Sequence, residues 1–293
     1  MSKRARETWS ETYLNRGTAP FWGFHLVAIL GVLYLGFSWT GLGLALAFYV
    51  ARMFFITAGF HRYFSHRAFK TSRPVQAVLA FGAQTSLQRG ALFWAAKHRH
   101  HHRFSDTPDD VHSAVRDGFW WSHLGWSTSK TSNGTDLTKV ADLAKFPELV
   151  WLNRWKHLPA VMLAVALLAL GGVHALVWGF FVSTVLLWHG TFTINSLSHM
   201  FGRRRYETTD TSRNNWALAI LTMGEGWHNN HHHYQSSANQ GFRWWQIDVT
   251  YYLLRGLAAV GLIWDVRRAP PHVVHGHARA PAAAAVPAAL AAG

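Results

Sequence analysis

Residues 158–198 read LPAVMLAVALLALGGVHALVWGFFVSTVLLWHGTFTINSLS, a stretch with no Asp, Glu, Lys or Arg. A helix needs about 20 apolar residues to cross a bilayer, so this stretch is long enough to cross twice. The glycine pair within residues 171–174 marks a tight turn. The stretch therefore predicts two transmembrane helices joined as a hairpin, at about residues 158–174 and 175–198.

A second apolar hairpin lies nearer the start of the chain, with helices predicted at about 21–39 and 41–60 and a tight turn at 40–43. Of the 28 Lys and Arg residues, 27 lie outside both hairpins, and neither turn carries one. Arg52 is the exception. Because positively charged loops stay on the cytoplasmic side, we expect four spans with both termini in the cytoplasm. The alternative, a buried helical core in a soluble protein, would not need this separation of charge.

The remaining segments are predicted to form a cytosolic cap on the four-helix stalk. Residues 75–96 are apolar but interrupted by Gln84, Gln88 and Arg89, which favours a helical hairpin at the membrane interface over a fifth span. The chain from residue 269 is rich in Ala and Pro and is expected to be disordered. We therefore predict an all-α, multi-pass protein of the bacterial inner membrane with three parts: a cytosolic N-terminal segment (1–20), a stalk-and-cap domain (21–268, with its cap at 61–157 and 199–268) and a disordered tail (269–293).

Composition limits the chemistry. The chain has 20 His and no Cys, so disulfides, Cys-bound zinc and iron–sulfur clusters are excluded. The net charge is +14, but the Lys and Arg residues form no recognisable nucleic-acid-binding module, so no nucleic-acid partner is expected. Any redox chemistry must therefore use metal bound by His and electrons supplied by another molecule.

Many of the histidines are grouped in four strings near the cytoplasmic ends of the spans or in the cap: HRYFSH (61–66), HRHHH (98–102), NSLSH (195–199) and HNNHH (228–232). In an α-helix residues i, i+3 and i+4 share one face, so each H-x-x-H-H pattern is expected to aim three imidazoles at one point. His100 and His233 fall off these faces and are not expected to be ligands. His61 and His66 are five residues apart and should diverge, which suits one ligand for each of two metals.

Nine His converging at one depth exceed what a single tetrahedral zinc can use, and imidazole suits iron as well as zinc. Two metals are therefore predicted. The isolated histidines, such as His25, His112, His123 and His189, are expected to be structural or exposed. A His-rich membrane metal transporter is the alternative from another functional class. A transporter would place its polar ligands at the bilayer midplane, whereas these strings lie at the cytoplasmic ends.

The strings resemble those of the membrane acyl-CoA desaturases of the stearoyl-CoA desaturase type. The resemblance rests on HRxxSH at 61–66, HxxHHRFSD at 98–106, NSxxH at 195–199 and EGWHNxHH at 225–232, in this order. It implies a cytosolic di-iron centre with nine histidine ligands, and with Asn195 reaching one metal through water. The metal-binding residues implied are His61, His66, His98, His101, His102, Asn195, His199, His228, His231 and His232.

The resemblance also implies a bent tunnel for the acyl chain. Gln88, Trp94 and Thr191 match family residues that line the bend beside the metals. Met53 lies two helical turns before the first ligand, and Tyr49 lies one turn further along. We expect these two side chains to close the far end of the tunnel and to favour chains of sixteen carbons or fewer.

Removing hydrogen from an unactivated methylene is beyond any side-chain acid or base, so no protein acid or base is assigned and the metal centre carries the chemistry. The resemblance implies O2-dependent formation of a cis double bond, expected at delta-9, with two Fe2+ ions as cofactor and acyl-CoA as the substrate. A fatty acyl or alkyl hydroxylase on the same centre is the alternative among enzymes.

The electron donor is expected to be a separate protein, ferredoxin-like or cytochrome b5-like. Only 28 residues follow Asp265, too few for a fused donor domain. The basic cap would favour an acidic donor, although it could equally hold CoA phosphates or lipid headgroups.

Overall fold

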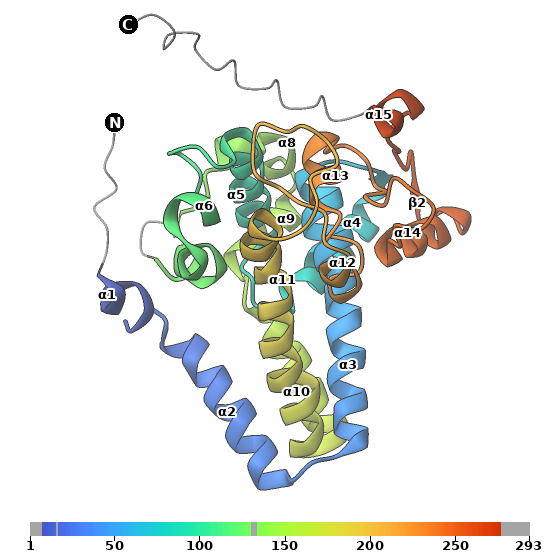
Figure 1. Cartoon of the computed structure of the whole chain (residues 1–293). Helices are drawn as coiled ribbons and strands as arrows, with labels where there is room; N and C mark the ends of the chain where they lie inside the picture. The colour runs from blue at the N-terminus through green and yellow to red at the C-terminus, as the bar shows by residue number, and fades with distance from the viewer. Residues whose placement is uncertain (1–7, 16, 130–133, 277–293) are drawn as a thin grey trace, which may run out of the picture.

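The computed structural model describes residues 8–15, 17–129 and 134–276, and these form a mostly helical molecule. Four long helices extend from one side of it, and we call them the stalk (Figure 1). The stalk consists of α2 (Ala19–Leu35), α3 (Trp39–Phe54), α10 (Leu158–Ala175) and α11 (Ser183–Met200). Two π-helical segments extend them: η1 (Phe55–Ser65) follows α3, and η5 (Leu176–Val182) joins α10 to α11.

The other elements are short and gather beyond the η1 end of the stalk, where we call them the cap (Figure 1). They are α1 (Trp9–Tyr13), α4 (Arg73–Gln84), α5 (Ala91–Phe104), α6 (Ala114–Asp117), η2 (Trp121–Gly125), α7 (Trp126–Thr128), η4 (Leu137–Val140), α8 (Ala141–Ala144), α9 (Pro147–Arg154), α12 (Trp216–Leu221), α13 (His228–His233), α14 (Val249–Ala259) and α15 (Pro271–His275). Two short strands, β1 (Lys70–Thr71) and β2 (Ile263–Trp264), pair antiparallel with Lys70 opposite Trp264.

Two continuous helical stretches are long and apolar enough to cross a membrane, Trp39–Ser65 and Leu158–Met200, and Ala19–Leu35 is a shorter apolar helix. The longer stretch is two helices and not one, because Gly172 has φ 63° and ψ −162°. Glycine tolerates this left-handed backbone without a steric penalty. The chain reverses there, so α10 and α11 lie side by side as the predicted hairpin (Figure 1).

The first stalk turn lies earlier than the sequence suggested. The chain turns at residues 36–38 and not at 40–43, so α2 ends at Leu35 and α3 already begins at Trp39. Gly36 has φ 75°, a conformation that ends a helix readily. The Ser38 hydroxyl accepts a 3.0 Å hydrogen bond from the Gly41 amide and caps the next helix. Hydropathy alone does not show where this cap lies.

The largest hydrophobic core lies where η1, α4 and α5 meet in the cap. Its fully buried side chains include Phe60, Phe64 and Leu92. Gly59 allows the close approach of α4 to η1, because a Cβ at this position would lie 3.1 Å from the Leu79 carbonyl oxygen. In contrast, the stalk exposes large apolar side chains, including Leu170 at 90% of its surface. Exposed apolar surface of this kind is what a helix facing lipid requires.

Residues 269–276 were predicted to belong to a disordered tail, but they are folded. They include α15, and the Val274 carbonyl accepts a 2.8 Å hydrogen bond from the Tyr206 hydroxyl and a second bond from Arg243. Composition did not reveal these contacts, which come from distant parts of the chain. The rest of the predicted tail, residues 277–293, lies outside the described residues.

Candidate metal centre

The structure brings all nine clustered histidines into two adjacent groups where the stalk meets the cap. Each group offers imidazole nitrogens that lie within 4.8 Å of one another. Group 1 consists of His61, His66, His98, His102 and His231, and group 2 of His101, His199, His228 and His232. The side chains come from η1, α5, α11 and α13, so four separate elements converge on this site.

The two H-x-x-H-H strings do not each aim at one point, contrary to the expectation from helical spacing. His98 and His102 belong to group 1, but His101 turns into group 2. The string on α13 also divides, with one histidine, His231, in group 1 and the other two, His228 and His232, in group 2. The groups are close enough for this division, since the ring centroids of His101 and His102 lie 5.5 Å apart. Each string therefore links the two groups.

His61 and His66 do not diverge, because the backbone between them is not an α-helix. The segment Phe55–Ser65 is π-helical, and the His66 amide donates to the His61 carbonyl, five residues back, at 3.2 Å. A π-turn contains more residues than an α-turn, so residues five apart lie nearly above one another. Both rings consequently join group 1, with centroids 4.8 Å apart.

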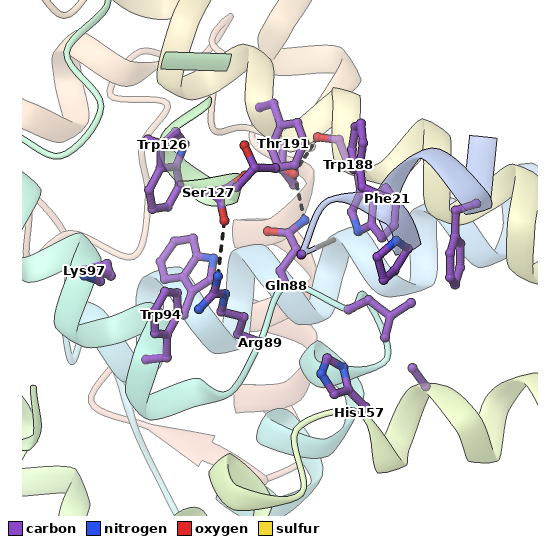
Figure 2. A pocket seen from close by; sticks show the side chains of 18 of the residues that line it. Phe21, Gln88, Arg89, Trp94, Lys97, Trp126, Ser127, His157, Trp188 and Thr191 are labelled. Atoms are coloured by element: carbon purple, nitrogen blue, oxygen red, sulfur yellow. Dashed lines mark hydrogen bonds between the residues drawn. The ribbon is translucent and has the colours of Figure 1, made fainter. Parts of the chain in front are cut away.

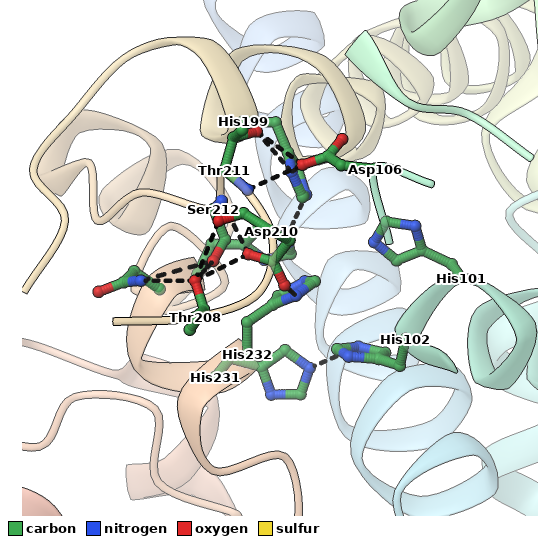
Figure 3. A network of polar contacts seen from close by, with 12 residues as sticks. His101, His102, Asp106, His199, Thr208, Asp210, Thr211, Ser212, His231 and His232 are labelled. Carbon is green, nitrogen blue, oxygen red and sulfur yellow. Dashed lines mark hydrogen bonds and ion pairs between the residues drawn. The ribbon is translucent and has the colours of Figure 1, made fainter. Parts of the chain in front are cut away.

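Each group is supported by carboxylates that contact the outer nitrogen of a histidine ring. Asp110 lies 2.9 Å from Nδ1 of His101, and Asp210 lies 2.6 Å from Nδ1 of His232. Figure 3 shows the latter contact, and also Asp106 beside His199. The Asp106–His199 distance is 3.3 Å, and Glu225 contacts Nδ1 of His61 in the same way. This carboxylate–histidine arrangement is typical of metal ligands, whose orientation it holds.

These contacts determine which ring nitrogen carries the hydrogen. A carboxylate only accepts, so Nδ1 of the contacted ring must donate, and Nε2 of the neutral ring keeps a lone pair. Nε2 of His101 and Nε2 of His232 are buried, and no described group donates to either nitrogen. Nε2 of His61 faces Nε2 of His231 at 3.0 Å. Lone pairs converging in a buried space need a cation between them, so both groups fit metal ions.

For most of the nine rings, the electrostatics favour the protonation state that a metal requires. Burial, reinforced by neighbouring imidazoles, holds the pKa of five rings well below the ordinary value: His66, His98, His102, His228 and His231. Burial alone would raise the pKa of Glu225, but His61 and Arg62 lower it to about 2. Neutral imidazoles and ionised carboxylates are the forms that bind cations.

Two predicted non-ligands lie outside both groups, as expected. His100 contacts the Asp109 carbonyl at 2.9 Å, and His233 stacks on Tyr206 with ring centroids 4.2 Å apart. His112 is closer to the centre than an isolated histidine was expected to be. Its ring is buried and stacks on His101, with centroids 4.1 Å apart.

A cavity of about 760 Å³ leads to this centre, and its wall includes His98 and Asn195. Predicted tunnel residues Gln88, Trp94 and Thr191 also line it. The Gln88 amide donates to the Thr191 hydroxyl at 2.8 Å (Figure 2). The volume falls within the range of about 300–1,000 Å³ that is typical of small-molecule sites.

Met53 and Tyr49, the predicted floor of the tunnel, are not among the residues that line this cavity. Met53 is fully buried, and the Tyr49 hydroxyl donates to the Leu221 carbonyl at 2.7 Å. Both side chains lie close to Gly190, next to Thr191 on α11. A helix backbone therefore stands between them and the cavity wall.

The four carboxylates are not among the predicted site residues. Two of them stood within the strings already singled out, since Asp106 ends HxxHHRFSD and Glu225 begins EGWHNxHH. Asp110 lies a few residues after HxxHHRFSD, and this closeness is a signal that could have identified it. Asp210 has no such local signal, because only the folded chain brings it to His232.

The chain was compared with known proteins. The family model described as fatty acid desaturase matches residues 37–268. The sn-1 stearoyl-lipid 9-desaturase of Synechocystis sp. is 41% identical over 254 residues, covering 85% of this chain and 79% of that protein. The protein of the same name from Anabaena variabilis is 38% identical, covering 86% and 93%. The acyl-CoA 5-desaturase of Anemone leveillei is 37% identical, covering 86% and 81%.

Proposed function

Because the chain belongs to the fatty acid desaturase family, we propose that this oxidoreductase introduces a cis double bond into a saturated acyl chain at the two histidine groups. The observation that carries the proposal is the position of these groups. Nine histidines form a partly buried group and a buried group at a cavity of suitable size for a ligand, and His98 belongs both to group 1 and to the cavity wall.

The cofactor proposed is two iron ions, one in each group, with O2 as co-substrate. Group 1 would supply five imidazoles, and group 2 would supply four, with Asn195 reaching its metal through water. When bound, the iron would supply the oxidising power that removes two hydrogens from neighbouring methylenes. The protein's own task is to position the chain and exclude water. Trp94 serves this task, because its ring stacks on His98 with centroids 4.7 Å apart.

The position of the double bond and the form of the substrate are finer proposals. Two of the relatives compared are named as stearoyl-lipid 9-desaturases and one as an acyl-CoA 5-desaturase. We propose delta-9 desaturation of a lipid-linked chain for this protein, and we keep the predicted acyl-CoA as the competing substrate. The two are separated by supplying each in turn to the purified enzyme.

We further propose that all four stalk helices span the membrane and that the cap lies in the cytoplasm, at the inner membrane if the source is bacterial. Support comes from the two long apolar stretches, the apolar α2 and the exposed apolar side chains of the stalk. Arg52, the one charge within the stalk, is buried and donates to the Thr184 hydroxyl at 2.7 Å. A charge at this depth is tolerated when it is paired in this way.

A separate electron donor is proposed because desaturation with O2 consumes two more electrons than the substrate provides. His66 and His102 of group 1 line a second, open depression together with Arg99 and Arg103. Arg99 is paired with Asp142 at 2.7 Å, so the exposed Arg103 supplies most of the positive charge at this approach, which favours an acidic ferredoxin-like or cytochrome b5-like donor.

Chain length remains a proposal that concerns Met53 and Tyr49. Met53→Ala would remove bulk behind Gly190 and let the wall at Thr191 relax, so the product ratio should shift from sixteen toward eighteen carbons. An unchanged ratio, or a shift toward shorter chains, would remove Met53 from the proposal.

The test of the function is expression in a host that lacks desaturase activity, with and without a ferredoxin. Gas chromatography of the host lipids should show new monounsaturated chains that depend on the intact histidine groups. Hydroxylated chains in their place would favour the hydroxylase alternative. Metal accumulation by the cells without any lipid product would favour the transporter.

A further inference from the structure

We infer that the acyl chain enters the cavity sideways from the bilayer, through a portal between the start of α2 and the first two turns of α10. This inference rests on the proposed function and adds the route by which a lipid-linked chain reaches the histidine groups. The portal is defined by Gly17 and Pro20 on one side and by Val161 and Val165 on the other.

These four residues line the cavity and are also exposed at the molecular surface. Val161 and Val165 expose 54% and 59% of their surface. A residue that is both exposed and part of the cavity wall marks a place where the cavity opens. Val161 and Val165 are four residues apart and so lie on the same face of α10.

The depth of the opening points to lipid and not to water. Pro20 lies in the first turn of the apolar α2, and Val161 and Val165 lie in the first two turns of a stretch that is apolar enough to cross a membrane. Apolar rim residues at this depth face acyl chains just below the headgroups.

The wall inside the portal is apolar and continues toward the centre. Phe24 and Ala164 follow the rim residues on their two helices, and both pack in one hydrophobic cluster with Leu87. Gln88 follows Leu87 along the chain, and its amide donates to the Thr191 hydroxyl (Figure 2). A chain entering at Val161 would therefore pass an apolar stretch of wall before it reaches Gln88, Thr191 and His98.

Two cationic side chains, Arg89 and Lys97, lie on the same cavity wall in the described part of the chain. The Arg89 guanidinium donates to the Ser127 carbonyl at 3.2 Å, which fixes its position (Figure 2). The polar head of a substrate would be attracted toward these charges while its chain passes the portal. The same charges would attract a CoA phosphate, so the experiment compares both substrates.

The test compares Val161→Trp with Met162→Trp, two neighbouring substitutions on α10. Met162 is 51% exposed, nearly the same as Val161, but it does not line the cavity. Both variants would be placed in nanodiscs that contain a stearoyl phospholipid, with reduced ferredoxin as the donor. Desaturation of that lipid and of added stearoyl-CoA would be measured, together with iron content and bound lipid by native mass spectrometry.

We expect Val161→Trp to lower both the rate with the phospholipid and the amount of bound lipid at least tenfold, and Met162→Trp to change neither more than twofold. Equal effects of the two variants would overturn the portal. It would also be overturned if stearoyl-CoA were the only substrate desaturated and Val161→Trp left its rate unchanged. If no variant desaturates either substrate but bound lipid still falls only in Val161→Trp, the portal stands and the proposed function fails.

Discussion

At the scale of single residues, Asp106, Asp110, Asp210 and Glu225 determine how the histidines present their nitrogens. Each carboxylate contacts Nδ1 of one ring and leaves Nε2 directed inward. Burial lowers the pKa of His232 to about 4 although Asp210 opposes this shift, so this ring is neutral near pH 7. The donor atoms are therefore arranged for a cation before any cation binds.

The first prediction concerns the two groups and their non-ligand neighbours. His231→Ala and His101→Ala should each abolish desaturation, because each removes a nitrogen from one group. His100→Ala and His233→Ala should retain it, since neither ring belongs to a group. Iron analysis of the purified wild-type protein from iron-replete cells should give about two ions per chain, as the ligand count requires. Loss of activity in His100→Ala with an active His98→Ala would contradict the assignment.

The second prediction concerns the orientation of His61. Glu225→Gln keeps the size of the side chain but replaces the carboxylate that holds the Nδ1 hydrogen of His61. Loss of such a partner typically lowers metal affinity or activity about 10–100-fold. Iron retention during dialysis against a chelator would measure the change.

Glu148→Gln is the matched control for this variant. Glu148 pairs with Arg73 at 2.7 Å, away from the histidine groups, and is partly exposed. Iron retention in Glu148→Gln should equal that of the wild type. If both variants lose iron equally, the carboxylate at His61 has no special role.

At the scale of elements, the π-helix η1 has the largest consequence for the site. It begins directly after α3, contains His61 and ends at Ser65, with His66 as its C-cap. Its position is held by Arg62, which is fully buried and contacts Glu225 at 2.9 Å and Asp248 at 3.0 Å. Removing one partner of a buried ion pair is strongly destabilising, so these contacts fix η1 as well as Glu225.

The third prediction tests the packing of η1 against α4. Gly59→Val should destabilise the protein by about 1–3 kcal/mol, because its side chain would press on the Leu79 backbone. The melting temperature in detergent should fall, and iron content should fall with it. Gly43→Val on α3 is the control, since no atom lies within 4 Å of a Cβ at that position. An unchanged melting temperature for Gly59→Val would show that α4 can move away without cost.

Three isolated histidines join elements that are distant in sequence, in agreement with their expected structural role. Nε2 of His25 on α2 lies 3.0 Å from Nε2 of His189 on α11. Nδ1 of His189 lies 3.0 Å from Nε2 of His123 on η2, and Nδ1 of His123 lies 3.0 Å from the Ser196 hydroxyl. This hydrogen-bonded row links the cap end of α2 to the rest of the molecule, beside the proposed portal.

At the scale of the whole molecule, the stalk carries much of the exposed apolar surface, and the metal-binding side chains lie where the stalk meets the cap. The histidine groups lie near the η1 end of the stalk helices, and Gly172 lies at the opposite end of α10. If the stalk spans a bilayer, these two places must lie on opposite sides of it.

The fourth prediction is this topology. Reporter fusions after residue 15, near residue 130 and near residue 275 should all report the cytoplasm, because the flanking segments carry the Lys and Arg residues. A reporter inserted at Gly172 should report the opposite side. A fusion near residue 275 found outside would mean that residues 249–264 also cross the membrane, and the arrangement of the cap would have to be revised.

The sequence by itself determined the helical class, the second stalk hairpin and the nine histidines that gather at the centre. These features depend on local properties, namely the length of apolar stretches and the spacing of ligand-type residues. Only the tertiary structure decided how the histidines divide between two groups, because the groups lie close enough for one string to reach both. The π-helical backbone before His66 also brings His61 and His66 into the same group. It also decided the partners at Nδ1, since Asp210 and His232 meet only in the folded chain. The cavity is lined by residues of α2, α10 and α11, which are distant in sequence, and no local pattern records how distant helices are arranged.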